Sequence, residues 1–65
     1  MEETLVYGGP GADFDVWWEV GTRNFTIMED GCVIERFKAY TIPKDEARAT
    51  RVAAGCMKIF ESEDV

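Results

Sequence analysis

The side chains of this chain that could do chemistry are carboxylates, and three of them lie close together in the sequence. Asp13, Asp15 and Glu19 fall within the stretch Asp13–Val20, whereas the chain has no histidine and its only serine is Ser62. General acid–base catalysis would therefore have to use these carboxylates. On an exposed strand they would be solvated and would lack the surroundings that tune a carboxylate for proton transfer. We therefore expect a protein that is not an enzyme.

The same residues offer little to a metal ion or a cofactor. Asp13 and Asp15 could ligate a hard cation, but calcium and magnesium sites usually take more oxygen ligands from a shaped loop. Zinc would need ligands besides Cys32 and Cys56. The segment Gly8-Gly9-Pro10-Gly11 could cradle a phosphate if it opened a helix, but it leads into a predicted strand and favours a simple turn. We expect no metal and no cofactor.

The stretch Asp13–Val20 alternates apolar and charged residues, which is the period of a strand with one buried face. The residues predicted to face the core are Phe14, Val16, Trp18 and Val20. The residues then exposed on the other face, about 6.6–6.8 Å apart along the strand, are Asp13, Asp15, Trp17 and Glu19. This assignment depends on Trp17, and not Trp18, being the exposed tryptophan.

Four strands and one helix are predicted. The strands are Glu3–Tyr7, Asp13–Val20, Phe25–Met28 and Cys32–Tyr40, and the helix runs from about Pro43 to Phe60. Asp30-Gly31 between two apolar runs indicates a tight hairpin. A β-bulge near Glu35-Arg36 would let two pairs face the core, Cys32 with Ile34 and Phe37 with Ala39. We predict one α+β domain over residues 1–65: an antiparallel sheet of three to four strands with the C-terminal helix packed on one face (ββββα).

The predicted helix has an apolar stripe and a basic face. The stripe consists of Ala49, Val52, Ala53, Cys56 and Phe60, flanked by Met57 and Ile59. Lys44, Arg51 and Lys58 are seven residues apart and are predicted on the opposite, solvent-facing side. Cys32 and Cys56 lie in apolar surroundings, which favours buried free thiols over a disulfide.

Charge is distributed unevenly along the chain. The net charge is −6, with eight acids and one base in residues 1–35 but six bases and two acids in residues 36–58. An acidic molecule repels nucleic acid as a whole and favours a basic partner. The first residues lack the basic start and apolar run of a signal peptide, and no segment approaches the length of a membrane span. We therefore expect a cytoplasmic protein.

The acidic strand face is the main candidate binding site. Its predicted residues are Asp13, Asp15, Trp17 and Glu19. Glu29 and Asp30 in the hairpin, and Glu2 and Glu3 near the sheet edge, could widen it. These carboxylates could engage arginines and lysines of a DNA-binding groove, with Trp17 as an anchor, because tryptophan is enriched in interface hot spots. Alternatively, Trp17 is covered by its own loop or tail. The basic helix face, consisting of Lys44, Arg51 and Lys58, either contacts an acidic partner or a phosphate backbone, or is an ordinary solvated surface.

The chain resembles phage-encoded anti-CRISPR proteins. It is very small and acidic, it lacks a recognisable group of catalytic residues, and its predicted exposed Trp17 lies between Asp15 and Glu19. The resemblance covers the whole chain by type and rests on no shared motif. It implies stoichiometric binding to a CRISPR effector in the host bacterial cytoplasm, often at the DNA-binding surface and sometimes by imitation of DNA charge. The basic helix departs from a uniformly acidic mimic.

Residues Gly31–Phe60 are also similar to the strand-then-helix half of three-stranded DNA-binding domains of the AP2 and integrase arm-binding type. The likeness lies in a hairpin, a strand with Phe37 and a helix that opens with Asp45-Glu46-Ala47. Those domains read the major groove with the exposed sheet face. Here Asp15 and Glu19 on that face would repel phosphate, so the likeness concerns the fold alone.

Together these features predict a monomeric, non-enzymatic inhibitor or adaptor. Its acidic sheet face would bind a basic, nucleic-acid-binding protein surface, and an anti-CRISPR protein acting by DNA mimicry is the most concrete form. Two alternatives stay open. One is a small nucleic-acid-binding regulator that uses the basic helix face, and the other is a subunit of a larger assembly in which another chain buries Trp17.

Overall fold

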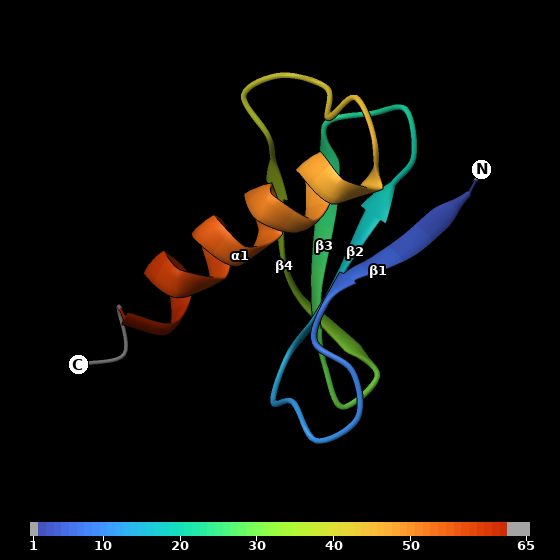
Figure 1. Ribbon diagram of the computed structural model, residues 1–65. Helices are drawn as coiled ribbons and strands as arrows, with labels where there is room; N and C mark the ends of the chain where they lie inside the picture. Colours follow the sequence, from blue (N-terminus) through green and yellow to red (C-terminus); the bar gives the residue numbers. More distant parts are fainter. Residues whose placement is uncertain (1, 63–65) are drawn as a thin grey trace.

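Short alternating segments build a four-stranded antiparallel sheet, and the computed structural model describes residues 2–62 of the chain. The strands lie side by side in chain order: β1 (Glu3–Tyr7), β2 (Asp15–Glu19), β3 (Asn24–Glu29) and β4 (Cys32–Lys38). Helix α1 (Glu46–Ser62) follows and lies across one face of this sheet (Figure 1). The predicted α+β fold with a C-terminal helix is confirmed.

The β3–β4 connection is a two-residue hairpin, as predicted from Asp30-Gly31. Glu29 pairs with Cys32, and the two residues between them both have positive φ, 52° for Asp30 and 79° for Gly31. Positive φ at both central positions is the geometry whose twist matches that of the flanking strands. The turn therefore sets where β4 begins to pair with β3.

The β2–β3 connection is held by Thr22. Its backbone N–H and its hydroxyl both donate to the Glu19 carbonyl, at 3.1 and 2.7 Å, and the hydroxyl oxygen accepts from the Asn24 N–H at 3.0 Å. The Thr22 carbonyl accepts from the indole N–H of Trp18 at 2.8 Å. Because this turn ends β2 at Glu19, Val20 is 40% exposed, and its predicted place in the core is wrong.

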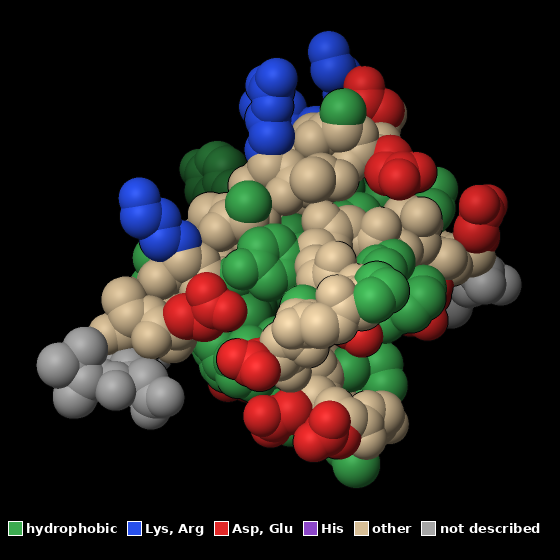
Figure 2. Space-filling model, turned by 60° about the horizontal axis from the view of Figure 1, so that its bottom comes forward, with side chains coloured by type: hydrophobic (Ala, Val, Ile, Leu, Met, Phe, Trp, Pro, Cys, Tyr) green, Lys and Arg blue, Asp and Glu red, His purple; other side chains and the backbone are tan. Residues whose placement is uncertain are grey.

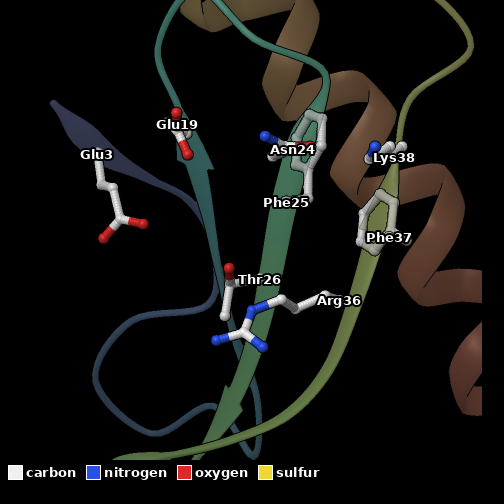
Figure 3. A pocket seen from close by; sticks show the side chains of 8 residues that line it. All are labelled: Glu3, Glu19, Asn24, Phe25, Thr26, Arg36, Phe37 and Lys38. Atoms are coloured by element: carbon white, nitrogen blue, oxygen red, sulfur yellow. The ribbon is translucent and has the colours of Figure 1, made fainter. Parts of the chain in front are cut away.

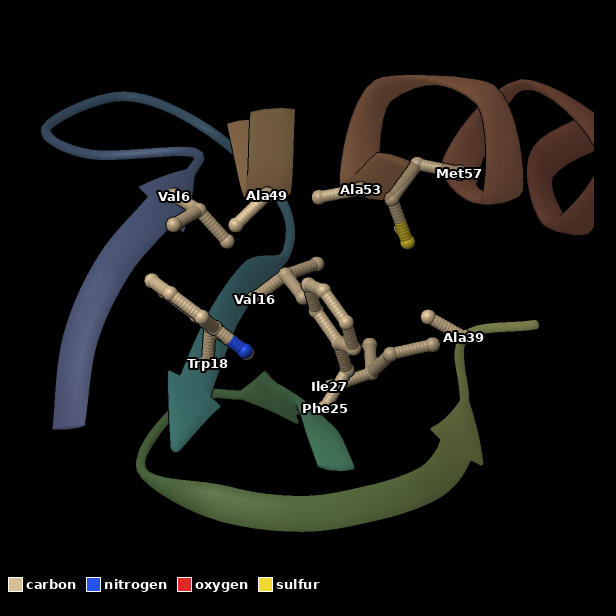
Figure 4. Packing of buried hydrophobic residues seen from close by; sticks show 9 residues of the cluster. All are labelled: Val6, Val16, Trp18, Phe25, Ile27, Ala39, Ala49, Ala53 and Met57. Atoms are coloured by element: carbon tan, nitrogen blue, oxygen red, sulfur yellow. The ribbon is translucent and has the colours of Figure 1, made fainter. Parts of the chain in front are cut away.

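The core lies between the sheet and α1 (Figure 4). Its buried residues are Val6, Val16, Trp18, Phe25, Ile27, Ala39, Ala49, Ala53 and Met57. Trp18 is 3% exposed, whereas Trp17 is only half-buried, so the predicted alternation of β2 is confirmed. The Phe25 ring stacks on the Phe37 ring of β4 with centroids 4.9 Å apart. Aromatic packing thus ties three neighbouring strands to one core.

Helix α1 begins three residues later than predicted. Asp45 caps it, since its Oδ1 accepts from the backbone N–H of Arg48 at 2.9 Å, and Pro43 is buried in the loop before it. An N-cap side chain satisfies a backbone donor that lacks a partner within the helix, which fixes the start of the helix. Within residues 2–62, no helix is long and apolar enough to cross a membrane.

The buried stripe of α1 differs from the predicted one at its C-terminal end. Ala49, Ala53 and Met57 are fully buried, whereas Cys56 is only partly buried. The helix is therefore rotated towards Met57, whose long flexible side chain fills the space above the sheet. Small residues at the other two positions let the helix axis approach the sheet closely.

Two bulges interrupt the sheet, one in β1 and one in β4. In β4, Ile27 pairs with Glu35 and Met28 with Val33, which leaves Ile34 as the extra residue, one position before the predicted bulge. The bulge does not bury Ile34, which is 41% exposed, or Cys32, which is also exposed. The prediction that these two residues face the core is wrong, because this end of β4 extends beyond the buried cluster. Phe37 is half-buried and Ala39 buried, as predicted.

Both cysteines are free thiols, and the structure joins neither Cys32 nor Cys56 in a disulfide. The predicted burial is wrong for Cys32, which is exposed near the hairpin, and only partly right for Cys56. A free cysteine on the surface carries no packing role, so the fold does not depend on Cys32.

Replacement of Met57 by alanine tests the rotation of α1. We expect Met57→Ala to lower the free energy of unfolding by about 2–5 kcal/mol, since it removes a fully buried side chain and leaves a cavity. The matched control is Cys56→Ala on the neighbouring position, for which we expect a loss below about 1 kcal/mol. Urea denaturation followed by circular dichroism measures both. A larger loss for Cys56→Ala than for Met57→Ala would contradict the observed rotation.

Candidate protein-binding face of the sheet

Helix α1 covers one face of the sheet, so the other face carries the side chains that alternate with the core residues. We call this the open face. One line of paired residues runs straight across it, from Leu5 through Trp17 and Thr26 to Arg36. Residues that pair across strands project to the same side of a sheet. These four residues, one from each strand, therefore lie side by side on the open face.

Trp17 lies near the middle of the open face. It is half-buried, between Leu5 of β1 and Thr26 of β3 as cross-strand neighbours. No helix covers it, and Leu5 is itself 38% exposed. A large aromatic side chain held rigidly in a sheet and still accessible is typical of an interface anchor.

Two glutamates lie directly opposite each other beside Trp17. Glu3 of β1 pairs with Glu19 of β2, and Figure 3 shows both carboxylates on the same side of the sheet. Side chains that are directly opposite in an antiparallel pair have Cβ atoms about 4.5–5.5 Å apart, and like charges there are destabilising. We call these two residues the acidic strip. A cation placed between them would relieve this repulsion.

Two cations occupy the far side of the same face. Arg36 pairs with Thr26 and Lys38 with Asn24, so both project to the open face from β4. Figure 3 shows the Arg36 side chain extending from β4 across β3 towards Thr26. We call Arg36 and Lys38 the basic strip. The open face is therefore acidic on β1–β2 and basic on β4, and not uniformly acidic.

The acidic and basic strips were not assigned to one face from the sequence, although part of the information was present. If Phe37 and Ala39 face the core, then alternation places Arg36 and Lys38 on the other face. Glu3 could be placed opposite Glu19 only with the β1–β2 register, which the sequence does not specify. A long glycine-rich loop separates these two strands, so no tight turn fixes their alignment.

Two shallow hollows mark the open face. One is lined by Glu3, Glu19, Phe25, Phe37, Asn24, Thr26, Arg36 and Lys38 (Figure 3). The other is lined by Glu3, Asp15, Trp17, Thr26, Met28 and Gly31. They share Glu3 and Thr26, so the two hollows adjoin each other across the sheet. Both hollows are open to solvent along the sheet, so one macromolecule could contact both of them.

Asp15 has a structural role in addition to its place on the open face. Its Oδ1 accepts a hydrogen bond from the backbone N–H of Gly9 at 3.0 Å. Gly8 has a φ of 99°, and a Cβ there would collide with the Phe14 carbonyl oxygen and the Asp15 carboxylate. The glycine-rich segment is therefore a loop that folds back onto the start of β2, and Asp15 holds it there.

The remaining residues predicted for the acidic face are scattered. Asp13 is exposed but lies in the loop before β2, because the strand begins two residues later than predicted. Glu29 follows Met28 in β3 and by alternation projects to the opposite side of the sheet. Asp30 lies in the hairpin turn with φ of 52°. Of the six residues predicted from the acidic strand and the hairpin, the structure brings Asp15, Trp17 and Glu19 together on the open face.

The predicted basic face of the helix is present on the solvent side. Arg51 and Lys58 are exposed on α1, and Arg48 lies one turn before Arg51 on the same side. Lys44 is also exposed, but it lies in the loop before α1, so its predicted place on the helix is wrong. We call these four residues the helix stripe. Figure 2 shows the Lys and Arg side chains gathered along one edge of the view, with acidic side chains below them and to their right. The helix stripe is directed away from the core.

The open face combines an aromatic side chain with charged groups of both signs. Among residues 2–62, no three or more His, Cys, Asp or Glu side chains are grouped so that they could hold a metal ion. The most prominent feature is an anchor, Trp17, flanked on one side by the acidic strip and on the other by the basic strip. Aromatic residues are enriched in protein interfaces, and charge complementarity contributes to their specificity, so this face is the candidate site.

The different roles of Asp15 and Asp13 can be tested by alanine replacement. We expect Asp15→Ala to lower the free energy of unfolding by about 1–2 kcal/mol, because the Gly9 N–H loses its partner. Asp13→Ala removes an exposed loop carboxylate, so the change should stay within about 0.5 kcal/mol. Chemical denaturation of the two variants measures both values. Equal effects would show that Asp15 does not hold the loop.

Comparison of the chain with models of protein families, with curated proteins and with solved structures found no match. Neither of the two resemblances described from the sequence gains support from these comparisons. The candidate site is accordingly assigned from the geometry and the chemistry of the open face alone.

Proposed function

We propose that this chain is a non-enzymatic binding protein, an inhibitor or adaptor, that docks a partner protein on the open face of its sheet. The observation that carries the proposal is Trp17, half-buried on a sheet face that no helix covers. Exposure of an aromatic side chain to water is unfavourable, and its burial in an interface recovers that free energy. The partner would cover Trp17 with an apolar pocket.

The acidic strip indicates which part of the partner is basic. Glu3 and Glu19 repel each other in the free protein, and an arginine or lysine of the partner placed between them would remove this repulsion. Charge complementarity of this kind raises association rates and selects among partners. The partner surface opposite β1 and β2 is therefore expected to be basic.

The concrete form of the proposal is an inhibitor that occupies the nucleic-acid-binding surface of its partner, as an anti-CRISPR protein that mimics DNA would do. The acidic strip would take the place of phosphates. Arg36 and Lys38 on the same face restrict the mimicry to the β1–β2 half and would contact an acidic border of the partner groove. A bacterial cytoplasm would be the site of action.

Reversal of the acidic strip tests this function. A set of purified CRISPR effector complexes and a labelled target DNA are mixed with the protein, and bound DNA is measured in a gel-shift assay. We expect the wild type to lower the bound fraction with at least one effector. Glu3→Lys/Glu19→Lys should weaken inhibition at least about tenfold, and Trp17→Ala about 30-fold, as for a hot-spot residue.

The matched control for the acidic strip is Glu29→Lys/Glu61→Lys. It changes the net charge by the same amount but alters residues that are exposed away from the open face, so inhibition should persist. Inhibition should also weaken as the salt concentration rises. Unchanged inhibition by Glu3→Lys/Glu19→Lys would refute the proposed role of the acidic strip.

A second candidate function, direct binding of nucleic acid, is favoured by one observation on the other side of the molecule. Lys44 and Arg48 of the helix stripe line a hollow together with Thr41 and Ile42. Tyr40, in the same loop, is 96% exposed. Cations beside an exposed aromatic ring suit single-stranded nucleic acid, which binds through phosphate contacts and base stacking.

A gel shift with labelled single-stranded DNA at low salt tests the second candidate. We expect any retention of DNA to be lost in Lys44→Glu/Arg48→Glu, because the positive charge beside Tyr40 disappears while the net charge of the whole molecule becomes more negative. The variant Arg36→Glu/Lys38→Glu is the matched control, with the same charge change on the open face. Retention that survives in Lys44→Glu/Arg48→Glu would exclude the hollow beside Tyr40 as the binding site.

A further inference from the structure

The open face carries opposite charges on its two sides, which makes it complementary to itself. The acidic strip lies on β1 and β2, the basic strip lies on β4, and Trp17, Thr26 and Met28 lie between them. We propose that the open face packs against the open face of a second copy of this chain. The product is a two-fold symmetric dimer in which Trp17 is buried.

The symmetry follows from the order of the strands. A two-fold axis parallel to the strands, midway between β2 and β3, places β1 of one copy over β4 of the other. Positions along the strand direction are unchanged by this rotation. We call a set of residues at the same height along the strands a level. One level consists of Glu3, Glu19, Asn24 and Lys38. Glu3 pairs with Glu19 and Asn24 with Lys38, and the adjacent pair Trp18–Phe25 aligns these two pairs. Glu3 of one copy therefore faces Lys38 of the second copy.

The next level supplies the apolar centre of the contact. Trp17 and Thr26 are cross-strand neighbours on either side of the axis, so Trp17 of one copy lies over Thr26 of the second copy. Leu5 at the same level lies over the aliphatic part of Arg36 of the second copy. Two sheets with aligned strands pack face to face at about 10 Å, with their inner side chains interdigitated. Each copy thus contributes Glu3 at one edge of the contact and Lys38 at the other, and the two edges, which we call the rims, are identical.

Two other surfaces, the edge of β4 and the helix stripe, would bring like charges together in a dimer. If β4 paired edge to edge with its own copy around a two-fold axis at Glu35 or at Arg36, the residue on the axis would lie opposite the same residue of the second copy. Like charges at such positions are destabilising and are a common protection of edge strands. The helix stripe would bring cations against cations. The open face is the surface on which a second copy finds opposite charges.

The size of the open face predicts a weak and reversible dimer. Four strands at about 4.8 Å spacing and five residues of strand length give a footprint of about 19 by 17 Å. This footprint of about 320 Å² per copy is well below the about 800 Å² per partner of a standard interface, as in weak and transient contacts. Monomer and dimer should therefore exchange, and a partner protein that needs Trp17 would compete with the second copy. The dimer itself does not rest on the proposed function, and it differs from the monomer expected from the sequence.

Reciprocal charge reversal tests the dimer. Sedimentation equilibrium of the wild type should show an apparent mass that rises with concentration from 7.4 kDa towards twice that value. In Glu3→Lys/Glu19→Lys both strips of the open face are basic. In Arg36→Glu/Lys38→Glu both strips are acidic. Each variant alone should dimerise at least about tenfold more weakly, because like charges now face each other. An equimolar mixture of the two variants should form a heterodimer, because opposite charges face each other at both rims.

Controls separate a lost interface from a lost fold. Arg51→Glu/Lys58→Glu carries the same charge change as Arg36→Glu/Lys38→Glu on the helix stripe and should dimerise like the wild type. If a reversal variant fails to fold by circular dichroism, Arg36→Gln/Lys38→Gln replaces it and should also weaken the dimer. In NMR spectra of the wild type, the Trp17 indole N–H resonance should shift with concentration, while that of the buried Trp18 should not.

A wild type that stays monomeric up to millimolar concentration overturns the proposal, as does a mixture of reversal variants that forms no heterodimer. A dimer that persists in both reversal variants would place the contact elsewhere and equally overturn it. These measurements use the purified chain alone. Failure of the dimer therefore leaves the partner assay to be judged by itself, and failure of the partner assay leaves the dimer standing.

Discussion

One helix can cover only one face of a four-stranded sheet, and this limit governs the whole molecule. Val16 and Trp18 pack beneath α1, so the alternation of β2 turns Trp17 and Glu19 to the uncovered side. Among residues 2–62, the four strands and α1 leave no second layer on that side. The same short strand thus supplies the centre of the core and the centre of the candidate binding face.

Polar side chains that look alike in the sequence serve different purposes in the fold. Asp15 accepts a hydrogen bond from the glycine-rich loop, Thr22 holds the β2–β3 turn, and Asp45 caps α1. Each satisfies backbone groups that would otherwise lack a partner within the protein. Glu19 makes no such contact with its carboxylate among the described hydrogen bonds, and it therefore stays available to a partner.

The arrangement of charge matters more than its total. A net charge of −6 suggests a uniformly acidic surface, yet the open face carries an acidic strip and a basic strip, and the helix stripe is basic as well. A face with both signs discriminates among partners by alignment, since a shifted or inverted partner would meet like charges. The same property makes the face complementary to a second copy, so the proposed dimer and the proposed partner would compete for Trp17.

The sequence by itself determined the features that depend on neighbouring residues. The alternation of β2, the burial of Trp18, the Asp30-Gly31 hairpin, the basic side of the helix and the α+β class all follow from local periodicity and turn chemistry. Those features account for the fold and for Trp17 and Glu19 of the candidate site. They could be predicted because each involves residues only a few positions apart.

Only the tertiary structure decided what depends on pairing between distant segments. It placed Glu3 opposite Glu19, brought Arg36 and Lys38 to the same face, put the bulge at Ile34 and left Asp13 in a loop. Register across a long loop is set by packing of the whole sheet against the helix, and a shift by one residue turns a side chain to the other face. The charge pattern of the open face is therefore a property of the folded sheet and not of any single stretch of the chain.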